Sequence, residues 1–178
     1  RIKKETSLLK YKRIILCDNF AIKNSFTSQK TQEYLKDLIN RLSFFKNAML
    51  IIPIFSKKIQ DKQNFTSHIK HSSMLLKHAM KKNVKISFEI FNKDKMIRKF
   101  CLKLSKIKNF GITYDTGNAY LFNKNFYNEL NFLKKFVNHI HLKDRDKLGR
   151  NVELGKGEIN FKKFFKELNF KKKYKGTI

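Results

Sequence analysis

Short apolar runs alternate with longer amphipathic segments along the chain, and this alternation restricts the fold more than any other feature of the sequence. The runs have the length of buried strands, and in the segments between them apolar residues recur at three- and four-residue steps, as on one face of a helix. Strands are predicted at residues 13–17, 48–55, 84–90, 110–115, 139–142 and 174–178, and helices at 31–47, 65–82, 94–106, 126–137 and 160–168. This order predicts right-handed βαβ crossovers and a parallel sheet in an α/β protein.

Two α/β architectures have this pattern, a doubly wound open sheet and a closed (β/α)8 TIM barrel. The dinucleotide-binding form of the open sheet has a glycine-rich turn after its first strand, and none follows Cys17. A barrel typically needs about 250 residues, with about 200 at the lower end, whereas this chain has 178. We therefore expect a partial TIM barrel with six visible βα units, forming a single domain over residues 1–178.

Both ends of the sequence are unlike those of a complete barrel. The chain starts at Arg1 instead of a methionine and stops at Ile178 inside an apolar run. We expect a fragment that lacks two N-terminal βα units and the C-terminal end. The single proline, Pro53, falls within the second predicted strand, and a central strand tolerates proline only at a bulge or at its end.

The formal net charge of +27 has two explanations. Such a charge attracts phosphates, so a nucleic acid or an anionic membrane is one class of partner. Biased residue usage is the other, because lysine, asparagine, isoleucine and phenylalanine all have A/T-rich codons and the positive residues are spread along the chain. We favour bias and expect no specific nucleic-acid partner, since net charge bears on solubility and non-specific binding and not on fold.

The cysteines and the apolar runs bear on location. Cys17 and Cys101 are far apart in apolar surroundings, which predicts two buried, reduced thiols in a cytoplasmic protein. No apolar run reaches the roughly 18 residues that a membrane helix needs, so no membrane partner is expected. The sequence does not determine the oligomeric state, and a homo-oligomer stays open.

Three polar residues stand at the ends of successive predicted strands. Glu89 closes ISFE, Asp115 closes GITYD, and His141 lies in HIHL. In a parallel barrel the carboxyl ends of the strands face one mouth, where active sites form. Two carboxylates and an imidazole can bind a divalent metal ion, with Mn²⁺ or Mg²⁺ favoured and Co²⁺ or Zn²⁺ as alternatives. We expect only one of His139 and His141 to face the barrel interior, with the two rings on opposite faces of the strand.

The segments ISFEI, GITYDTGNAY, VNHIHLKDRD, GRNVELGKGEINF and YKGTI resemble the sugar phosphate isomerase/epimerase family, whose members have a xylose isomerase-like TIM barrel. Their order and spacing match from about residue 13 to the end, most strongly over 84–178. HIHLKDR followed by GRNVxLGxGExxF is the most distinctive part. The resemblance implies a metal-dependent isomerase or epimerase of a sugar or sugar phosphate, similar to the ketose 3-epimerases and the pentulose-phosphate epimerases.

The metal ligands of this family are Glu, Asp, His and Glu from the last four strands, and the resemblance places the first three on Glu89, Asp115 and His141. The fourth would follow Ile178, so the chain as given would lack one ligand and is expected to be inactive by itself. In the family the two metal-bound glutamates exchange protons with the sugar through an enediolate. The resemblance therefore implies that Glu89 is a catalytic acid/base.

The resemblance also implies substrate contacts. Asn118 stands where sugar 3-epimerases often have a histidine, and Lys95 stands where they often have a second glutamate. Asn118 better suits the phosphosugar or inositol-pathway relatives. Lys143, Arg145 and Lys156 are candidates for binding the substrate, because family-like barrels bind phosphate with the loops after the last strands and a helix N-terminus.

Two other functions are kept as alternatives. Related barrels include the apurinic-site endonuclease IV, which holds several zinc ions with additional histidines. Here His68, His71 and His78 lie on one predicted helix, away from the strand ends. The second alternative is a non-catalytic, basic binding protein. Metal content and salt-dependent DNA binding would distinguish both from a sugar isomerase.

Overall fold

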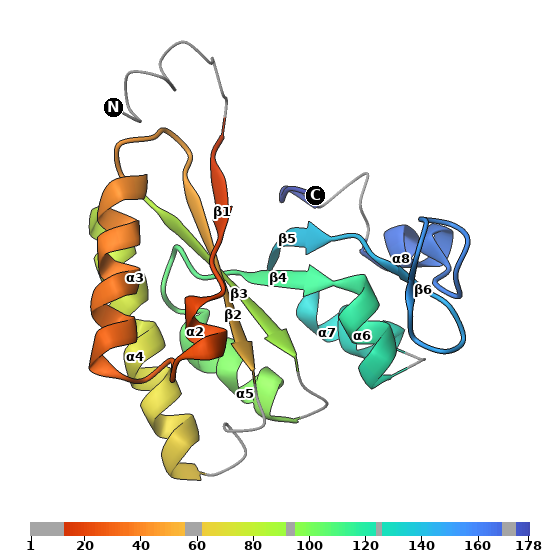
Figure 1. Ribbon diagram of the computed structural model, residues 1–178, viewed down its shortest axis with the longest axis horizontal. Coiled ribbons are helices and arrows are strands. Elements are labelled where there is room, and N and C mark those ends of the chain that lie inside the picture. Colours follow the sequence, from red (N-terminus) through yellow and green to blue (C-terminus); the bar gives the residue numbers. More distant parts are fainter. Residues whose placement is uncertain (1–12, 56–61, 92–94, 124–125, 169–173) are drawn as a thin grey trace.

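Five parallel strands form one sheet in which the spatial order follows the order in the chain (Figure 1). The structure, a computed structural model, describes residues 13–55, 62–91, 95–123, 126–168 and 174–178. The strands are β1 (Ile15–Cys17), β2 (Met49–Phe55), β3 (Lys85–Phe91), β4 (Ile112–Asp115) and β5 (Val137–His141). A doubly wound sheet reverses its strand order part-way. Here the order is sequential and the sheet curls into part of a barrel. This confirms the predicted (β/α)8 TIM-barrel class in partial form.

In the described residues, helices follow or separate the strands. The helices of eight or more residues are α3 (Gln29–Leu42), α4 (Lys62–Lys81), α5 (Lys95–Leu104) and α8 (Phe161–Leu168); the shorter ones are α2 (Phe20–Lys23), α6 (Thr116–Phe122) and α7 (Tyr127–Leu133). In α3, the Ser28 hydroxyl caps the first turn, and Leu35, Ile39 and Leu42 recur on one buried face. Within the described part of the chain, none of the helices is long and apolar enough to cross a membrane.

Two apolar clusters join the helices to one face of the sheet. Leu50 and Ile52 of β2 and Phe88 of β3 pack with α3, α4 and α5, whereas Ile112 of β4 and Ile140 of β5 pack with α5, α7 and α8. Successive residues of a strand point to opposite faces, so the residues between these turn to the concave face. On β3, β4 and β5 these residues are polar: Ser87, Glu89, Thr113, Asp115, His139 and His141. The strand pattern thus lines the barrel interior with polar side chains.

The predicted elements are present with shifted ends, and some short elements have no counterpart in the sequence pattern. Helix α3 stops before the predicted end at residue 47, where Asn47 adopts a left-handed φ of 56°. The pattern does not predict α2, α6 or the antiparallel pair β6 (Asp144–Arg145) and β7 (Asn151–Val152). Of the strand predicted at 174–178, the structure has one parallel bridge, between Thr177 and His139 of β5. Short elements with little apolar periodicity are therefore the ones that the pattern misses.

Pro53 lies within β2, which has a neighbouring strand on each side. The backbone N–H of Asp18 donates to the carbonyl of Ile51 at 3.1 Å, so the Ile51 backbone faces β1, and the Pro53 backbone faces the same way by alternation. The pairing of β1 with β2 ends at Cys17 and Ile51. The N–H that proline lacks would therefore point beyond the end of β1, where no ladder hydrogen bond is lost.

The two cysteines differ in exposure. Cys101 is buried as predicted, and burial raises the pKa of its thiol to about 12. Cys17 is exposed at the end of the edge strand β1, so the prediction of a buried thiol is wrong for this residue. Partial burial of its sulfur, together with the carboxylates of Glu89 and Asp18, raises the pKa of Cys17 to about 11. Both thiols are therefore protonated and weakly nucleophilic at neutral pH.

A β-bulge near the start of β5 sets the direction of its later side chains. Ile112 pairs with Val137, but the next residue of β4, Thr113, pairs with His139. Asn138 is therefore an additional residue in β5. Val137 remains in the apolar cluster under the helices. The bulge allows Val137 to stay on that face while His139 turns to the concave one.

The Asn138 side chain links β5 to β3 across the barrel interior. Its Oδ1 accepts a hydrogen bond from the Ser87 hydroxyl at 2.6 Å, and Ser87 Oγ also lies 2.6 Å from Thr113 Oγ1. Gly111 makes room for the amide, because a Cβ at this position would collide with the Asn138 side chain. A glycine at this position is thus required by packing and not by backbone conformation.

We expect Gly111→Ala to destabilise the fold by roughly 2 kcal/mol, because the added methyl group displaces the Asn138 amide from Ser87. Urea unfolding followed by circular dichroism measures this change. The control is the same substitution in an Asn138→Ala background, where the amide is gone and the methyl group has space. An equal loss of stability in both backgrounds would contradict this explanation.

Candidate metal centre

Glu89, Asp115 and His141 lie together at the carboxyl ends of β3, β4 and β5. His141 Nδ1 is 3.3 Å from Glu89 Oε1 and 3.8 Å from Asp115 Oδ2, and one ligand atom from each residue lies within 4.8 Å of the others. Strand register explains the convergence. Asp115 pairs directly with His141, and Glu89 pairs with Thr113, the preceding inward-facing residue of β4.

The geometry of these three side chains fits a divalent cation. Such an ion binds oxygen and nitrogen at about 2.0–2.2 Å, so two of its ligand atoms are roughly 3–4 Å apart. The separations of 3.3 Å and 3.8 Å fall in this range. The side chains of Glu89 and Asp115 are 6% and 1% exposed, and that of His141 is 25% exposed, so the cluster is accessible from the histidine side. The role of these residues as metal ligands stays a prediction.

The two oxygens of Asp115 have different partners. Oδ1 caps α6 by accepting a hydrogen bond from the backbone N–H of Asn118 at 2.8 Å. Oδ2 is buried and faces His141 and the Lys143 ammonium, whose Nζ is 2.8 Å away. Oδ2 nevertheless has no well-aligned hydrogen bond with any described residue, so the lysine contact is an ion pair of poor hydrogen-bond geometry. The cap therefore leaves Oδ2 as the oxygen available to a cation.

Lys143 is held beside Asp115 by the first residues of α6. Its backbone N–H donates to Thr116 Oγ1 at 2.9 Å, and the Thr116 hydroxyl donates to its carbonyl at 2.7 Å. A Cβ at Gly117 would come within 2.8 Å of the Lys143 Cβ, so glycine allows this close approach. The Lys143 side chain is 43% exposed, and its ammonium can therefore be reached from solvent.

His139 and His141 lie on the same face of β5, and the prediction that their rings point to opposite faces is wrong. Residues two apart in a strand share a face, and the two rings are in edge contact at 5.0 Å with an interplanar angle of 89°. His139 Nδ1 is 2.6 Å from Thr177 Oγ1. Burial, together with the neighbouring His141 and the Arg13 guanidinium, lowers the pKa of His139 to about 4. His139 is therefore a neutral interior residue at physiological pH.

The three predicted substrate-binding residues outside α6 have different surroundings. Lys143 contacts Asp115, as described above. Arg145 Nη1 donates to the carbonyl of Gly149 at 3.0 Å, which ties the guanidinium to its own loop. Its Nε is buried and has no hydrogen-bond partner in the described part of the chain. Lys156 is exposed on the loop between β7 and α8. Of these three, only Lys143 has a described contact with the candidate metal ligands, and the binding roles of all three stay predictions.

Asp144 organises the loop that follows the candidate site, and the sequence reasoning missed it. The residue is buried, with 1% of its surface exposed. Its Oδ2 accepts hydrogen bonds from Gly155 N at 2.8 Å and Gly157 N at 2.9 Å, and its Oδ1 accepts from Arg145 N at 2.9 Å and Ile159 N at 3.2 Å. The available signal was an aspartate ahead of a glycine-bearing loop, a pattern that often marks a carboxylate bonded to backbone N–H groups.

The helix histidines take no part in the cluster. His68 Nδ1 donates to the carbonyl of Asn64 at 2.7 Å, and His71 Nδ1 donates to that of Ser67 at 2.8 Å, so both bond to their own helix, α4. Burial lowers the pKa of His68. Within the described ranges, Glu89, Asp115 and His141 are the one group of three or more His, Cys, Asp or Glu side chains that could share an ion.

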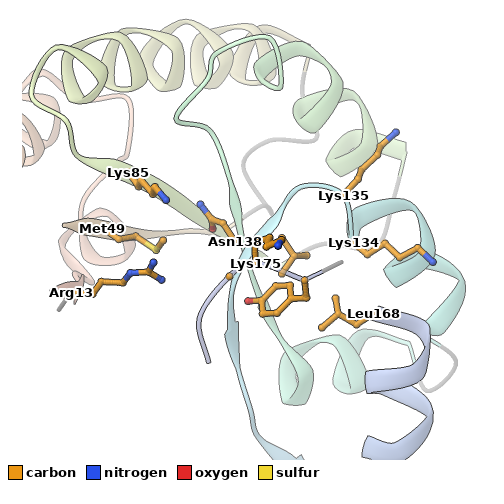
Figure 2. Close-up of a pocket in the computed structure, with 11 residues that line it drawn as sticks. Arg13, Met49, Lys85, Lys134, Lys135, Asn138, Leu168 and Lys175 are labelled. Carbon is orange, nitrogen blue, oxygen red and sulfur yellow. The ribbon is translucent and has the colours of Figure 1, made fainter. Parts of the chain in front are cut away.

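A cavity of about 560 Å³ lies at the end of the strands opposite to Glu89, Asp115 and His141 (Figure 2). Met49, Lys85 and Val137, the first residues of β2, β3 and β5, line it together with Arg13 and Asn138. Lys134 and Lys135 lie at its edge, but their ammonium groups have other partners. That of Lys134 donates to a backbone carbonyl and an amide oxygen, and that of Lys135 lies over two aromatic rings. Ligands of α/β barrels bind at the carboxyl ends of the strands, so we place the candidate site at the triad and not in this cavity.

Comparisons with known proteins agree with the fold. The family described as "Xylose isomerase-like TIM barrel" matches residues 14–178. Among solved structures, a D-tagatose 3-epimerase-like protein has a TM-score of 0.76 and 18% identity over 99% of this chain and 73% of its own. An L-ribulose 3-epimerase has 0.78 and 13% over 99% and 64%, and the IOLI protein, solved with a zinc atom, has 0.74 and 14% over 99% and 70%. No curated protein matches the sequence. At these identities the likeness to solved structures supports the fold alone.

Proposed function

The chain belongs to the xylose isomerase-like TIM barrel family, and from this premise we propose that it is a divalent-metal-dependent isomerase or epimerase of a sugar or sugar phosphate. The observation that supports the proposal most directly is the convergence of Glu89, Asp115 and His141 within 4.8 Å at the carboxyl ends of three adjacent strands. Active sites of TIM barrels form at this end. The epimerases among the similar structures agree with the choice of reaction class.

The proposed metal site uses two carboxylates and one imidazole. Glu89 and Asp115 each offer an oxygen and His141 offers Nδ1. This oxygen-rich set favours Mn²⁺ or Mg²⁺, with Co²⁺ or Zn²⁺ as alternatives. A bound divalent ion would act as a Lewis acid that polarises the sugar carbonyl and acidifies the adjacent C–H bond.

Glu89 is the proposed catalytic acid/base. Its side chain is 6% exposed and lies 3.3 Å from His141 Nδ1, so its position is fixed and largely shielded from water. The carboxylate would remove the proton from the carbon beside the carbonyl, which converts the sugar to an enediolate. Return of a proton to the other face gives the epimer, and return to the neighbouring carbon gives the isomer.

Basic and amide side chains would bind the substrate. Lys143 is closest to the proposed ligands, 2.8 Å from Asp115, and Asn118 is fixed at the start of α6 by its backbone hydrogen bond to the same carboxylate. Arg145 and Lys156 belong to the adjoining hairpin and loop. This set of positive side chains supports a phosphate on the substrate, because ammonium and guanidinium groups pair with phosphate oxygens. A small-molecule sugar is thus the proposed partner.

Deuterium wash-in tests the proposed reaction. The complete gene product, loaded with Mn²⁺, is incubated in D₂O with ketoses and ketose phosphates, and ¹H NMR follows loss of the C–H signal beside the carbonyl. We expect metal-dependent exchange with at least one substrate, because exchange requires only one base such as Glu89. The absence of exchange with any sugar in the presence of Mn²⁺, Mg²⁺, Co²⁺ or Zn²⁺ would refute the proposed function.

A further inference from the structure

The Lys143 ammonium lies beside Asp115 Oδ2, the oxygen that the proposed metal ion needs. Asp115 Oδ2 is 3.8 Å from His141 Nδ1 and 2.8 Å from Lys143 Nζ, so a bound ion and this ammonium would share one carboxylate oxygen. The other oxygen of Asp115 is committed to the α6 cap, through the Asn118 N–H at 2.8 Å. A small rotation of the carboxylate therefore cannot supply the two cations with separate oxygens without breaking the cap.

The position of Lys143 is built into the fold. Two reciprocal hydrogen bonds with Thr116 fix its backbone, and Gly117 leaves space for its Cβ. Its side chain is 43% exposed, however, so the ammonium can move into solvent while its backbone stays in place. The Asp115 side chain, by contrast, is 1% exposed and has no such freedom.

We infer that Lys143 competes with the metal ion for Asp115 Oδ2 and thereby sets how tightly the site holds its ion. The ammonium and the metal ion, both positive and both beside this oxygen, would repel each other strongly, because they would be close together and Asp115 is buried. Metal binding would therefore displace the ammonium towards the mouth of the barrel. Lys143 is a positioning residue in this inference, since it acts on Asp115 and not on the reacting atoms. The inference rests on the proposed metal-dependent function.

Metal binding by charge variants tests the inference without an activity assay. The complete gene product is titrated with Mn²⁺ alone, and electron paramagnetic resonance measures the free ion. We expect Lys143→Met to bind Mn²⁺ about tenfold more tightly, because the variant lacks the nearby positive charge that repels the ion. Lys143→Arg keeps the charge and should bind much as the unaltered protein does.

Lys147→Met is the matched control, because this exposed lysine lies nearby in the turn between β6 and β7 and its loss changes the net charge equally. We expect its Mn²⁺ affinity to stay within about twofold of the unaltered protein, since exposed charges are strongly screened. Thermal melts of each variant verify that it is folded.

The outcomes separate the inference from the proposed function. Failure of the folded, unaltered protein to bind Mn²⁺ would overturn the inference, and the exchange experiment with Mg²⁺, Co²⁺ and Zn²⁺ would then decide the proposed function. If the unaltered protein binds Mn²⁺ and Lys143→Met binds it equally or more weakly, Lys143 does not compete with the ion and instead supports Asp115 as a ligand. Tighter Mn²⁺ binding by both Lys143→Met and Lys147→Met would also overturn the inference, because the change in affinity would then reflect net charge alone.

Discussion

Glu89→Gln is expected to remove both metal binding and turnover. The substitution keeps the shape of the side chain but removes a negatively charged ligand and the proposed base. We expect the Mn²⁺ affinity to fall by roughly a hundredfold or more and the rate of proton exchange by a further factor of about 10²–10⁴. Calorimetric titration with Mn²⁺ measures the first effect, and deuterium wash-in at saturating metal measures the second.

The control for this experiment is Glu153→Gln, which removes the same charge from an exposed residue of the loop after β7. It should leave metal affinity and exchange unchanged. A Glu89→Gln protein that binds Mn²⁺ normally and still exchanges the substrate proton would show that Glu89 is neither ligand nor base. Normal Mn²⁺ binding with loss of proton exchange would support Glu89 as the base and exclude it as a metal ligand.

Asp144→Ala is expected to have the largest effect on stability. Four backbone N–H groups, those of Arg145, Gly155, Gly157 and Ile159, donate to this buried carboxylate. Loss of these hydrogen bonds leaves four N–H donors without the carboxylate, and the loop residues Leu148 and Leu154 are exposed and add little apolar packing. We expect a loss of about 4 kcal/mol, because hydrogen bonds to a charged acceptor each contribute about 1.5–3 kcal/mol and water replaces part of them. Urea unfolding measures the change.

Asp37→Ala is the matched control, since Asp37 forms an exposed pair with Arg41 on α3 at 2.7 Å. Exposed pairs of this kind contribute less than about 1 kcal/mol. Similar unfolding midpoints for the two variants would mean that the loop around Asp144 is not stabilised by its carboxylate. A loss confined to loop residues, seen by hydrogen exchange, would show that the loop unfolds separately from the barrel.

The parallel sheet and the convergence of the triad are predictable because both depend on local patterns. A strand that packs under helices alternates apolar and polar side chains, and Glu89, Asp115 and His141 occupy the polar positions at the strand ends. The topology then brings these ends to one mouth. The contacts of Asn138 with Ser87 and Ile86 join residues 51 and 52 positions apart, so no local pattern reveals them.

Three further features of the structure differ from what we expect from the local sequence. The apolar pattern predicts no helix directly after residue 115, but Asp115 is a preferred helix N-cap and α6 starts at Thr116. The sequence His-Ile-His already implies that both rings share a face. Cys17 has apolar neighbours in the sequence, yet β1 is an edge strand of the described sheet, so burial on both sides does not follow. Exposure of an edge is a property of the sheet and not of the run.

Because of the bulge at Asn138, β5 can lose one residue there while the side chains that follow keep their direction. Because Asn138 and His139 together oppose Thr113, deletion of residue 138 would leave a regular strand whose histidines still face inward. Deletion of Ile140 would instead send His141 towards the helices. Alignment gaps among homologues should therefore be tolerated before His139 and selected against after it.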